Sequence, residues 1–280
     1  MFTQGLHVRG MLICLSMGAA LHWGATGVAH AVDGMILITQ QKAQTGSVTP
    51  GDAPGFPVTL SQPGSYRLSG NLTVPDQNTT AIQVTTDNVT IDLNGFSILG
   101  PNLANGLGEG ISAGSRTNIS VLNGTVRGMG SRGVFLGNKG RAQGLQLISN
   151  SEGVQVGVDS LIKDVTALDN RITGVYIFGK STILNSVVSQ NGEDGILAGD
   201  DCLIQGNTVH GNGRYGISLG GSSTVLQNTV TGNADFGLLL GSRTGYAQNV
   251  VSDNKIISGP QVSGGLQMGT NVCGSDTICP

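Results

Sequence analysis

Apolar and polar positions follow a pattern that repeats every 21 residues between Gly153 and Ile257. Each repeat opens with a glycine that starts a short run of alternating apolar residues, and an asparagine stands 17 positions later. The glycines are Gly153, Gly174, Gly195, Gly216 and Gly237, and the asparagines are Asn170, Asn191, Asn212, Asn233 and Asn254. A repeat of this length is typical of a solenoid, in which each repeat forms one turn.

Short aliphatic runs with period two recur inside each repeat and form columns, such as Ile162, Ile183, Ile204, Val225 and Tyr246. Short β-branched runs separated by Gly, Asn, Asp and Ser predict strands and turns rather than helices. The fixed leucine offsets of a leucine-rich repeat are absent from the sequence. We therefore expect an all-β fold, a right-handed single-stranded parallel β-helix with three strands per turn and turns about 4.7–4.9 Å apart.

The asparagine column predicts a ladder of side-chain amides that hydrogen-bond from turn to turn. Asparagine tolerates the left-handed backbone conformation that sharp corners need, and glycine adopts it without strain. We expect both columns to sit at such corners in this conformation. The sequence therefore gives these asparagines a structural role rather than a binding role.

Residues 1–31 are expected to be a signal peptide. Arg9 supplies a positive start, Met11–Ala29 is mostly apolar, and Ala29-His30-Ala31 is a small-x-small cleavage site. A retained membrane anchor is the alternative, but His22 and several glycines interrupt the apolar run. Export is favoured, which makes the mature protein secreted or periplasmic and free of the membrane after cleavage.

The remaining chain is expected to form one domain. Residues 32–64 are interpreted as an N-terminal cap and extended lead-in, in which 33–45 forms either a short amphipathic helix or, over 35–39, a strand. Residues 65–270 are interpreted as the β-helix, with about nine turns and a loop inserted at 101–109. Residues 271–280 form the C-terminal tail.

The net charge indicates which partners the protein can bind, and the cysteines indicate how they behave in an oxidising compartment. The formal net charge is −3, and removal of Arg9 with the leader makes it −4, which argues against nucleic acid as a partner. In an oxidising compartment, Cys273 and Cys279 are expected to form a disulfide that closes the tail. Cys202 falls in a column of small residues and is expected to be buried and inert.

The repeats and the phrase Val-Thr-Ile-Asp-Leu-Asn-Gly at 89–95 resemble the secreted right-handed parallel β-helix repeat proteins of bacteria, in the pectin-lyase-like superfamily. That superfamily includes carbohydrate-binding and sugar-hydrolase β-helix domains. The resemblance implies a protein that recognises or processes an extracellular, uronate-rich polysaccharide, as a lyase or glycosidase if it is an enzyme. The alternative is a non-catalytic surface, adhesion or structural rod. The oligomeric state stays open.

The segment Gly199-Asp200-Asp201-Cys202 resembles the paired-carboxylate segment of polygalacturonases, so Asp200 and Asp201 are catalytic candidates. The spacing departs from that family, which places its other catalytic elements on successive turns, whereas His210 follows Asp201 by only nine residues. Asp201 also falls in a column of alternating charge, which favours a charge-balanced turn instead. This column is Arg116, Lys139, Asp159, Lys180, Asp201, Ser222 and Arg243.

Basic residues cluster where no acid occurs between Glu109 and Glu152. By resemblance to pectate lyases, which use an arginine base and calcium-binding acids, Arg127 is a further catalytic candidate, and calcium is the one cofactor left open. Arg116, Arg132 and Lys139 are candidates for binding an acidic polysaccharide. If these charges point in several directions around the coil, polysaccharide binding by this cluster is not favoured. If an arginine meets Glu109 on a groove, a catalytic function is favoured.

The outward positions of the first strand of each repeat form a stripe of Phe135, Gln155, Tyr176, Leu197, Ser218 and Leu239. Phe135 and Tyr176 are candidates for stacking against sugar rings. The alternative is that they lie under the tail or a partner. No glycine-rich loop ends in a lysine, and no zinc-type Cys/His spacing occurs in the sequence, so no other cofactor is expected.

Overall fold

The structure is a computed structural model of the chain, and it describes Met1 and residues 34–102, 105–254, 260–274 and 279. The chain divides into two units, Met1–Val32 and Asp33–Pro280, and the fold described below is that of the second. The expected signal peptide and its cleavage site, apart from Met1, lie outside the described residues.

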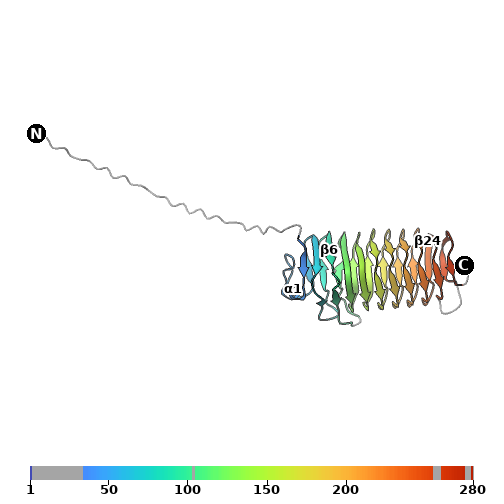
Figure 1. Cartoon of the computed structure of the whole chain (residues 1–280), viewed down its shortest axis with the longest axis horizontal. Helices are drawn as coiled ribbons and strands as arrows, with labels where there is room; N and C mark the ends of the chain where they lie inside the picture. The colour runs from blue at the N-terminus through green and yellow to red at the C-terminus, as the bar shows by residue number, and fades with distance from the viewer. Residues whose placement is uncertain (2–33, 103–104, 255–259, 275–278, 280) are drawn as a thin grey trace. The chain divides into compact units, whose positions relative to one another are not determined.

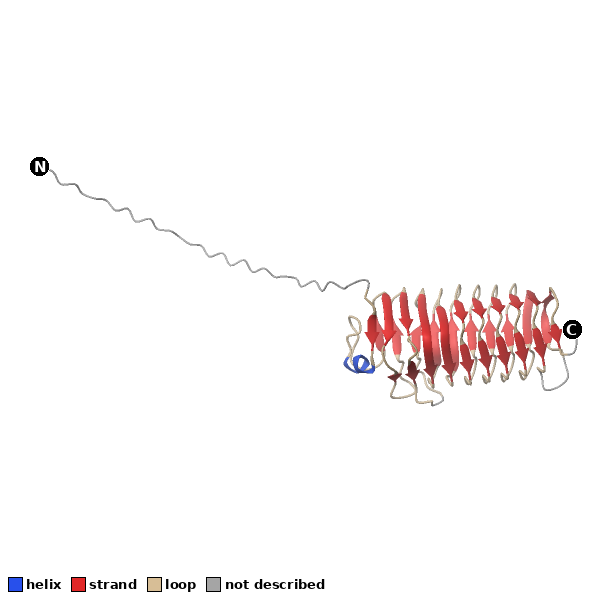
Figure 2. Cartoon of the chain, viewed as in Figure 1, coloured by secondary structure: helices blue, strands red, loops and turns tan. Residues whose placement is uncertain are grey.

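The second unit is a right-handed parallel β-helix of about ten turns, against the nine expected (Figure 1). Its short strands make three parallel sheets along the coil axis (Figure 2). Within the regular array each strand pairs with the one 21 residues later, as Val154 does with Val175. The expected fold class is confirmed.

The first sheet contains β2 (Val58–Leu60), β5 (Ile82–Val84), β8 (Ile111–Ala113), β10 (Arg132–Leu136), β12 (Glu152–Val156), β15 (Val175–Ile177), β18 (Ile196–Ala198), β21 (Ile217–Leu219) and the first parts of β24 (Leu238–Ala247) and β26 (Val262–Gln267). The second sheet contains β1 (Ile36–Ile38), β3 (Gly64–Leu68), β6 (Val89–Asp92), the first parts of β9 (Ile119–Arg127) and β11 (Arg141–Ile148), β13 (Leu161–Lys163), β16 (Thr182–Leu184), β19 (Leu203–Gln205), β22 (Thr224–Leu226) and the second parts of β24 and β26.

The third sheet contains β4 (Leu72–Thr73), β7 (Ser97–Leu99), the second parts of β9 and β11, β14 (Thr166–Leu168), β17 (Val187–Ser189), β20 (Thr208–His210), β23 (Thr229–Thr231), β25 (Val250–Ser252) and β27 (Val272–Cys273). Strand pairing thus extends beyond the expected bounds of 65 and 270 at both ends. We call the bends after the first, second and third sheets the first, second and third corners.

The core is a column of aliphatic side chains inside the coil. In β15, Val175 and Ile177 are fully buried whereas Tyr176 between them faces outward, as period-two alternation requires. The same alternation buries Ile196 in the next turn and Val154 in the preceding one. Burial of these columns is the main favourable contribution to folding.

The N-terminal end contains both expected alternatives, one after the other: strand β1 and then helix α1 (Gln40–Thr45), blue in Figure 1. The side chain of Thr39 accepts a hydrogen bond from the backbone N–H of Lys42, which caps the helix, and Ala43 is fully buried. Within the described residues, no helix has the length and hydropathy needed to cross a membrane.

The expected asparagine ladder is confirmed at the third corner, where it begins with Asn150 and ends with Gln261. Asn191 donates from its side-chain Nδ2 and from its backbone N–H to Oδ1 of Asn212, at 2.9 and 3.1 Å. Each side chain thereby satisfies both a neighbouring side chain and a neighbouring backbone group. The other members repeat this geometry: Asn150, Asn170, Asn212, Asn233 and Asn254.

The prediction that the ladder asparagines and opening glycines adopt a left-handed backbone conformation is wrong. None of the ladder asparagines has a positive φ; the residue before each one does, as Gln190 shows at 56°. The opening glycines also lack a positive φ, and they are glycine for another reason. A Cβ at Gly195 would lie 2.6 Å from Nδ2 of Asn212 and 2.7 Å from the carbonyl oxygen of Gly216. The glycine column makes room for the ladder of the next turn.

Two further ladders, not predicted from the sequence, follow the other corners. At the second corner, Asn207, Asn228, Asn249 and Asn271 join in the same way as the first ladder. At the first corner the ladder is made of hydroxyls: the backbone N–H of Ser160 donates to Ser181, and that of Ser223 to Thr244. Cys202 is the one cysteine in this buried column, and burial raises the pKa of its thiol.

Candidate functional site

The outer side of the first sheet presents neighbouring side chains at one turn's spacing, and we call it the first-sheet face. Phe135 of β10 pairs with Ser112 on one side and Gln155 on the other, and Gln155 pairs with Tyr176 of β15. Rungs about 4.8 Å apart put Phe135 and Tyr176 about 10 Å from each other. The structure therefore brings the two predicted aromatic residues onto one face, separated by a glutamine.

Arg132 is fixed beside this face at the third corner. Its Nη1 lies 2.7 Å from Oε1 of Glu109, its Nε lies 3.1 Å from Oε2 of Glu152, and its guanidinium stands 4.4 Å from the centre of the Phe135 ring. Glu109 is buried, and it ends the segment 101–109 that was expected to be an inserted loop. Two carboxylates and a ring face therefore already engage the charge of Arg132.

A hollow of about 320 Å³ opens next to the Phe135 ring, and we call it the Phe135 groove. It is lined by Gly114, Phe135, Leu136, Gly137, Asn138, Gln155, Gly157, Val158 and Phe178, none of which is charged. A Cβ at Gly114 would fall 2.0 Å from the Phe135 ring, so this glycine gives the ring its place. The ring of Phe178 lies 4.9 Å from that of Tyr176, which extends the aromatic surface.

Charged residues of the first corner border the groove. Lys139, Asp159, Lys180 and Asp201 occupy one left-handed position on successive turns, with φ between 55° and 58°. The expected column is wrong at its first member, because Asn118 holds the left-handed position in the turn of Arg116. Between paired positions of neighbouring turns, the linker 114–119 has two more residues than the linker 137–140, and these displace Arg116 from the column.

The catalytic candidates do not come together. Oδ1 of Asp200 accepts a hydrogen bond of 2.7 Å from the backbone N–H of Gly221, and Asp201 is exposed at the first corner. Arg127 lies at the end of β9 in the third sheet, where it pairs with Leu99 and Ile148. Asp200 and Asp201 thus share the first corner of one turn, whereas Arg127 lies on another side and another turn of the coil.

A second polar and aromatic cluster at the third corner was not predicted. Oδ1 of Asp194 accepts a hydrogen bond of 3.3 Å from the backbone N–H of Tyr215 and lies 3.8 Å from Nε of Arg214. The guanidinium of Arg214 covers the Tyr215 ring at 4.4 Å, and that ring stacks on Phe236 at 6.3 Å. Burial raises the pKa of Asp194, against the opposing effects of the Tyr215 N–H and Arg214. Asp194, Tyr215 and Phe236 each stand directly before an opening glycine, as Arg132 stands before Gly133. This column is the signal in the sequence that could have predicted the cluster.

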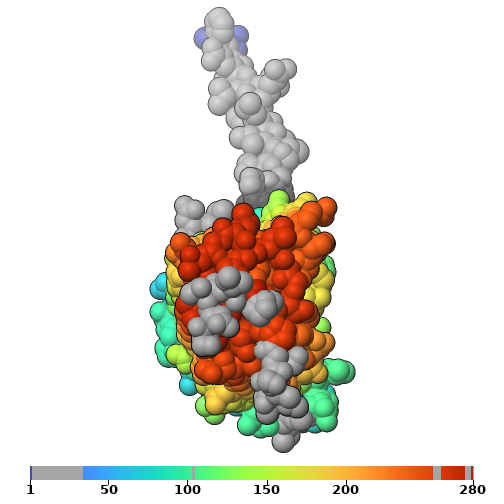
Figure 3. Space-filling view, turned by 90° about the vertical axis from the view of Figure 1, so that its right-hand side faces the viewer, coloured from blue at the N-terminus to red at the C-terminus, as the bar shows by residue number. Residues whose placement is uncertain are grey.

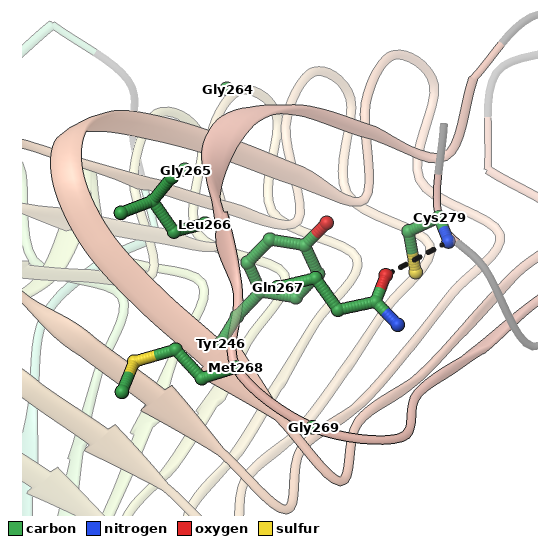
Figure 4. Close-up of a pocket in the computed structure, with 8 residues that line it drawn as sticks. All are labelled: Tyr246, Gly264, Gly265, Leu266, Gln267, Met268, Gly269 and Cys279. Atoms are coloured by element: carbon green, nitrogen blue, oxygen red, sulfur yellow. Dashed lines mark hydrogen bonds between the residues drawn. The ribbon is translucent and has the colours of Figure 1, made fainter.

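The C-terminal end, which faces the viewer in Figure 3, carries a larger open hollow of about 780 Å³, and Figure 4 shows the residues that line it. Its lining includes Tyr246, the exposed side chains of Leu266 and Met268, and Gln267, whose Oε1 accepts a hydrogen bond from the backbone N–H of Cys279. Cys279 is joined to Cys273 by a disulfide, which ties the end of the chain to β27. The described lining offers one titratable group, Tyr246, and burial raises its pKa.

Comparison with known proteins agrees with this architecture. A family model described as "Periplasmic copper-binding protein (NosD)" matches residues 141–271, somewhat less than half of the chain. Among solved structures, the A-module of the mannuronan C-5 epimerase AlgE6 of Azotobacter vinelandii is similar with a TM-score of 0.64 and 16% identity, over 82% of this chain and 69% of that one. The expected β-helix resemblance is confirmed.

Two further structures show the same likeness. The A-module of the mannuronan C-5 epimerase AlgE4 from the same organism has a TM-score of 0.56 and 16% identity, over 82% of this chain and 80% of that one. The pectate lyase Pel9A has a TM-score of 0.56 and 13% identity, over 85% and 73%. At these identities the likeness is one of fold. No curated protein matches the sequence.

Proposed function

We propose that this protein is exported and binds a polysaccharide of the periplasm or the extracellular space along its first-sheet face. The observation that carries the proposal is the row of Phe135, Gln155 and Tyr176 on successive turns beside an uncharged groove. Aromatic rings offer the apolar face of a sugar a stacking surface, and a neighbouring amide can pair with its hydroxyls. Turns at a constant spacing suit a ligand that is itself a repeating chain.

The similar structures support this assignment. AlgE6 and AlgE4 are mannuronan epimerases and Pel9A is a pectate lyase, so the fold is used on polysaccharides in each of these three proteins. The leader expected at residues 1–31 and the periplasmic family matched at 141–271 support export.

The geometry favours recognition over catalysis. Arg132 does meet Glu109 beside the groove, as an enzyme would require, but Glu152 pairs with the same guanidinium. Asp200 is engaged by a backbone N–H, and Arg127 lies on another sheet. A lyase or glycosidase needs a base or a pair of carboxylates free to act on the same bond. The described candidates do not supply that arrangement.

A non-catalytic rod is the second candidate function, and the three ladders favour it. Hydrogen-bonded columns follow every corner of the regular array, and each one joins successive turns. Such a coil resists bending whatever it binds. A rod would need no conserved chemistry on the first-sheet face and would retain its role without glycan binding.

Copper binding is not part of the proposal. In the part of the chain that the structure describes, no three His, Cys, Asp or Glu side chains gather closely enough to hold a metal ion. His210 is exposed at the end of β20, and Cys202 is buried. These residues do not fit the copper site that the family description names.

Affinity electrophoresis on pectate, alginate and neutral glucans tests the proposal. We expect retardation by at least one polymer, loss of it in Phe135→Ala and Tyr176→Ala, and retention in Val187→Ala, which truncates an exposed apolar side chain on the third sheet. Unsaturated-uronide absorbance and reducing ends are followed with calcium and with chelator. Product formation that is lost in Arg127→Ala or Asp201→Ala would make the protein an enzyme. If no polymer retards the protein, the non-catalytic rod remains as its function.

A further inference from the structure

We propose that Gln155 is the residue that recognises sugar hydroxyls in the Phe135 groove, and that the groove takes an uncharged pyranose chain rather than a uronate. This inference rests on the proposed function and specifies its ligand. It concerns a side chain that was not among the residues predicted to bind substrate.

Gln155 is more than nine-tenths buried, with 9% of its surface exposed, yet its side-chain amide makes no hydrogen bond to any described residue. No described side-chain nitrogen or oxygen is both fully enclosed and unpaired, so the Gln155 amide reaches the open space of the groove. Gln83, on the same face, donates its amide to the backbone carbonyl of Ser112 instead. The Gln155 amide is therefore available to pair with water or with a ligand that enters the groove.

The groove around this amide has the shape and surface for a sugar ring. The rings of Phe135 and Phe178 contribute apolar faces, and Gly114 and Gly157 line the groove without adding side chains. The amide supplies both a donor and an acceptor, which is the pair that adjacent ring hydroxyls require. Apolar walls with a few placed polar groups are typical of small-ligand sites.

The charges around the groove decide against a uronate. A uronate chain carries one carboxylate per sugar, and a binding site for it needs free arginine or lysine side chains. Arg132, the cation in contact with the groove's own aromatic ring, is paired with Glu109 and Glu152. The charged residues of the first-corner rim alternate in sign from turn to turn, as Lys139, Asp159 and Lys180 do, and none of them lines the groove. The residues that would contact the ligand therefore offer a uronate no positive charge.

Isothermal titration calorimetry separates these claims. The purified protein is titrated with a neutral glucan hexasaccharide, an oligogalacturonate and an oligomannuronate, each at 50 and 500 mM NaCl. Gln155→Met keeps the side-chain length but removes the amide, and it breaks no protein hydrogen bond, so thermal unfolding should be unchanged. Gln205→Met removes an amide from the outer side of the second sheet, where Nε2 of Gln205 donates to Oε1 of Gln227 at 2.8 Å, and it serves as the control for loss of an amide outside the groove.

We expect the neutral glucan to bind with the same affinity at both salt concentrations, and Gln155→Met to weaken it about tenfold, as loss of one or two hydrogen bonds predicts. Gln205→Met should bind like the wild type. Equal affinity of Gln155→Met and wild type would overturn the role of Gln155. Tighter binding of a uronate that weakens at high salt would overturn the ligand class but leave the proposed function standing. Absence of binding to all three would refute the proposed function itself.

Discussion

Replacement of one ladder asparagine tests how the coil is held together. Asn212 lies within the third-corner ladder and is almost fully buried. Its Oδ1 accepts hydrogen bonds from the backbone N–H and the side chain of Asn191, at 3.1 and 2.9 Å. Its Nδ2 donates to Oδ1 of Asn233 at 2.8 Å and to the carbonyl oxygen of Val188 at 3.3 Å. Asn212→Ala removes all four.

The cost follows from those contacts. A hydrogen bond contributes about 1 kcal/mol net, and a buried donor left without a partner costs about 1–3 kcal/mol. In Asn212→Ala the backbone N–H of Asn191 loses its acceptor inside the corner. We expect the free energy of unfolding to fall by about 3–5 kcal/mol. Because each turn contacts only its neighbours, the loss should open the coil locally and reduce the cooperativity of unfolding.

Urea denaturation followed by far-ultraviolet circular dichroism measures this loss. His210→Ala is the control, because it truncates an exposed side chain of the same turn and should change stability by less than about 0.5 kcal/mol. A loss below about 1 kcal/mol in Asn212→Ala would refute the reasoning. It would mean that aliphatic burial alone fixes the stacking of the turns.

Three further outcomes are expected from the corners. Gly195→Ala should destabilise the fold by at least as much as Asn212→Ala in the same denaturation experiment, because its Cβ would meet Nδ2 of Asn212 at 2.6 Å; wild-type stability would contradict this. Cys202→Ser should unfold at the same or a slightly higher urea concentration, since a hydroxyl continues the ladder better than a sulfur; a loss of more than about 1 kcal/mol would contradict this. Burial raises the pKa of Asp194 above 3.8, so the folded state binds the proton more tightly, and wild-type stability should fall as pH rises through the folded pKa. Asp194→Asn should therefore be more stable than wild type near pH 7 and lose that advantage below pH 3.8; the opposite sign at pH 7 in the same measurement would be inconsistent with the raised pKa.

The fold was predictable because the repeat displays it directly. Period-two aliphatic runs at a spacing of 21 residues define strands, and like residues one repeat apart must then stack. The backbone details were less accessible. The sequence shows that Gly195 recurs but cannot show whether it provides a left-handed φ or room for the Asn212 side chain. The Asn207 and Asn228 ladder recurs in the sequence as well, but its first member is a serine, Ser186, so its column of asparagines is shorter.

The site was predictable only in part. Alternation placed Phe135 and Tyr176 on one outer face, since that needs no more than the strand register. The pairing of Arg132 with Glu109 depends on how the irregular segment before β8 packs, and no repeat fixes that packing. The missing partner of Gln155 is a property of its surroundings rather than of its residue type. Sequence patterns indicate which way a side chain faces, but not whether its polar groups find hydrogen-bond partners.

The most direct test of the binding site is the side-chain amide signal of Gln155 in a ¹⁵N–¹H correlation spectrum. Gln155→Met assigns it by its disappearance. On titration with the glycan that retards the protein, we expect the Gln155 Nε2 signals to shift with a saturable dependence, together with backbone signals of Phe135 and Phe178. Unchanged Gln155 signals, with shifts confined to another surface such as the C-terminal hollow around Tyr246, would contradict binding at the first-sheet face.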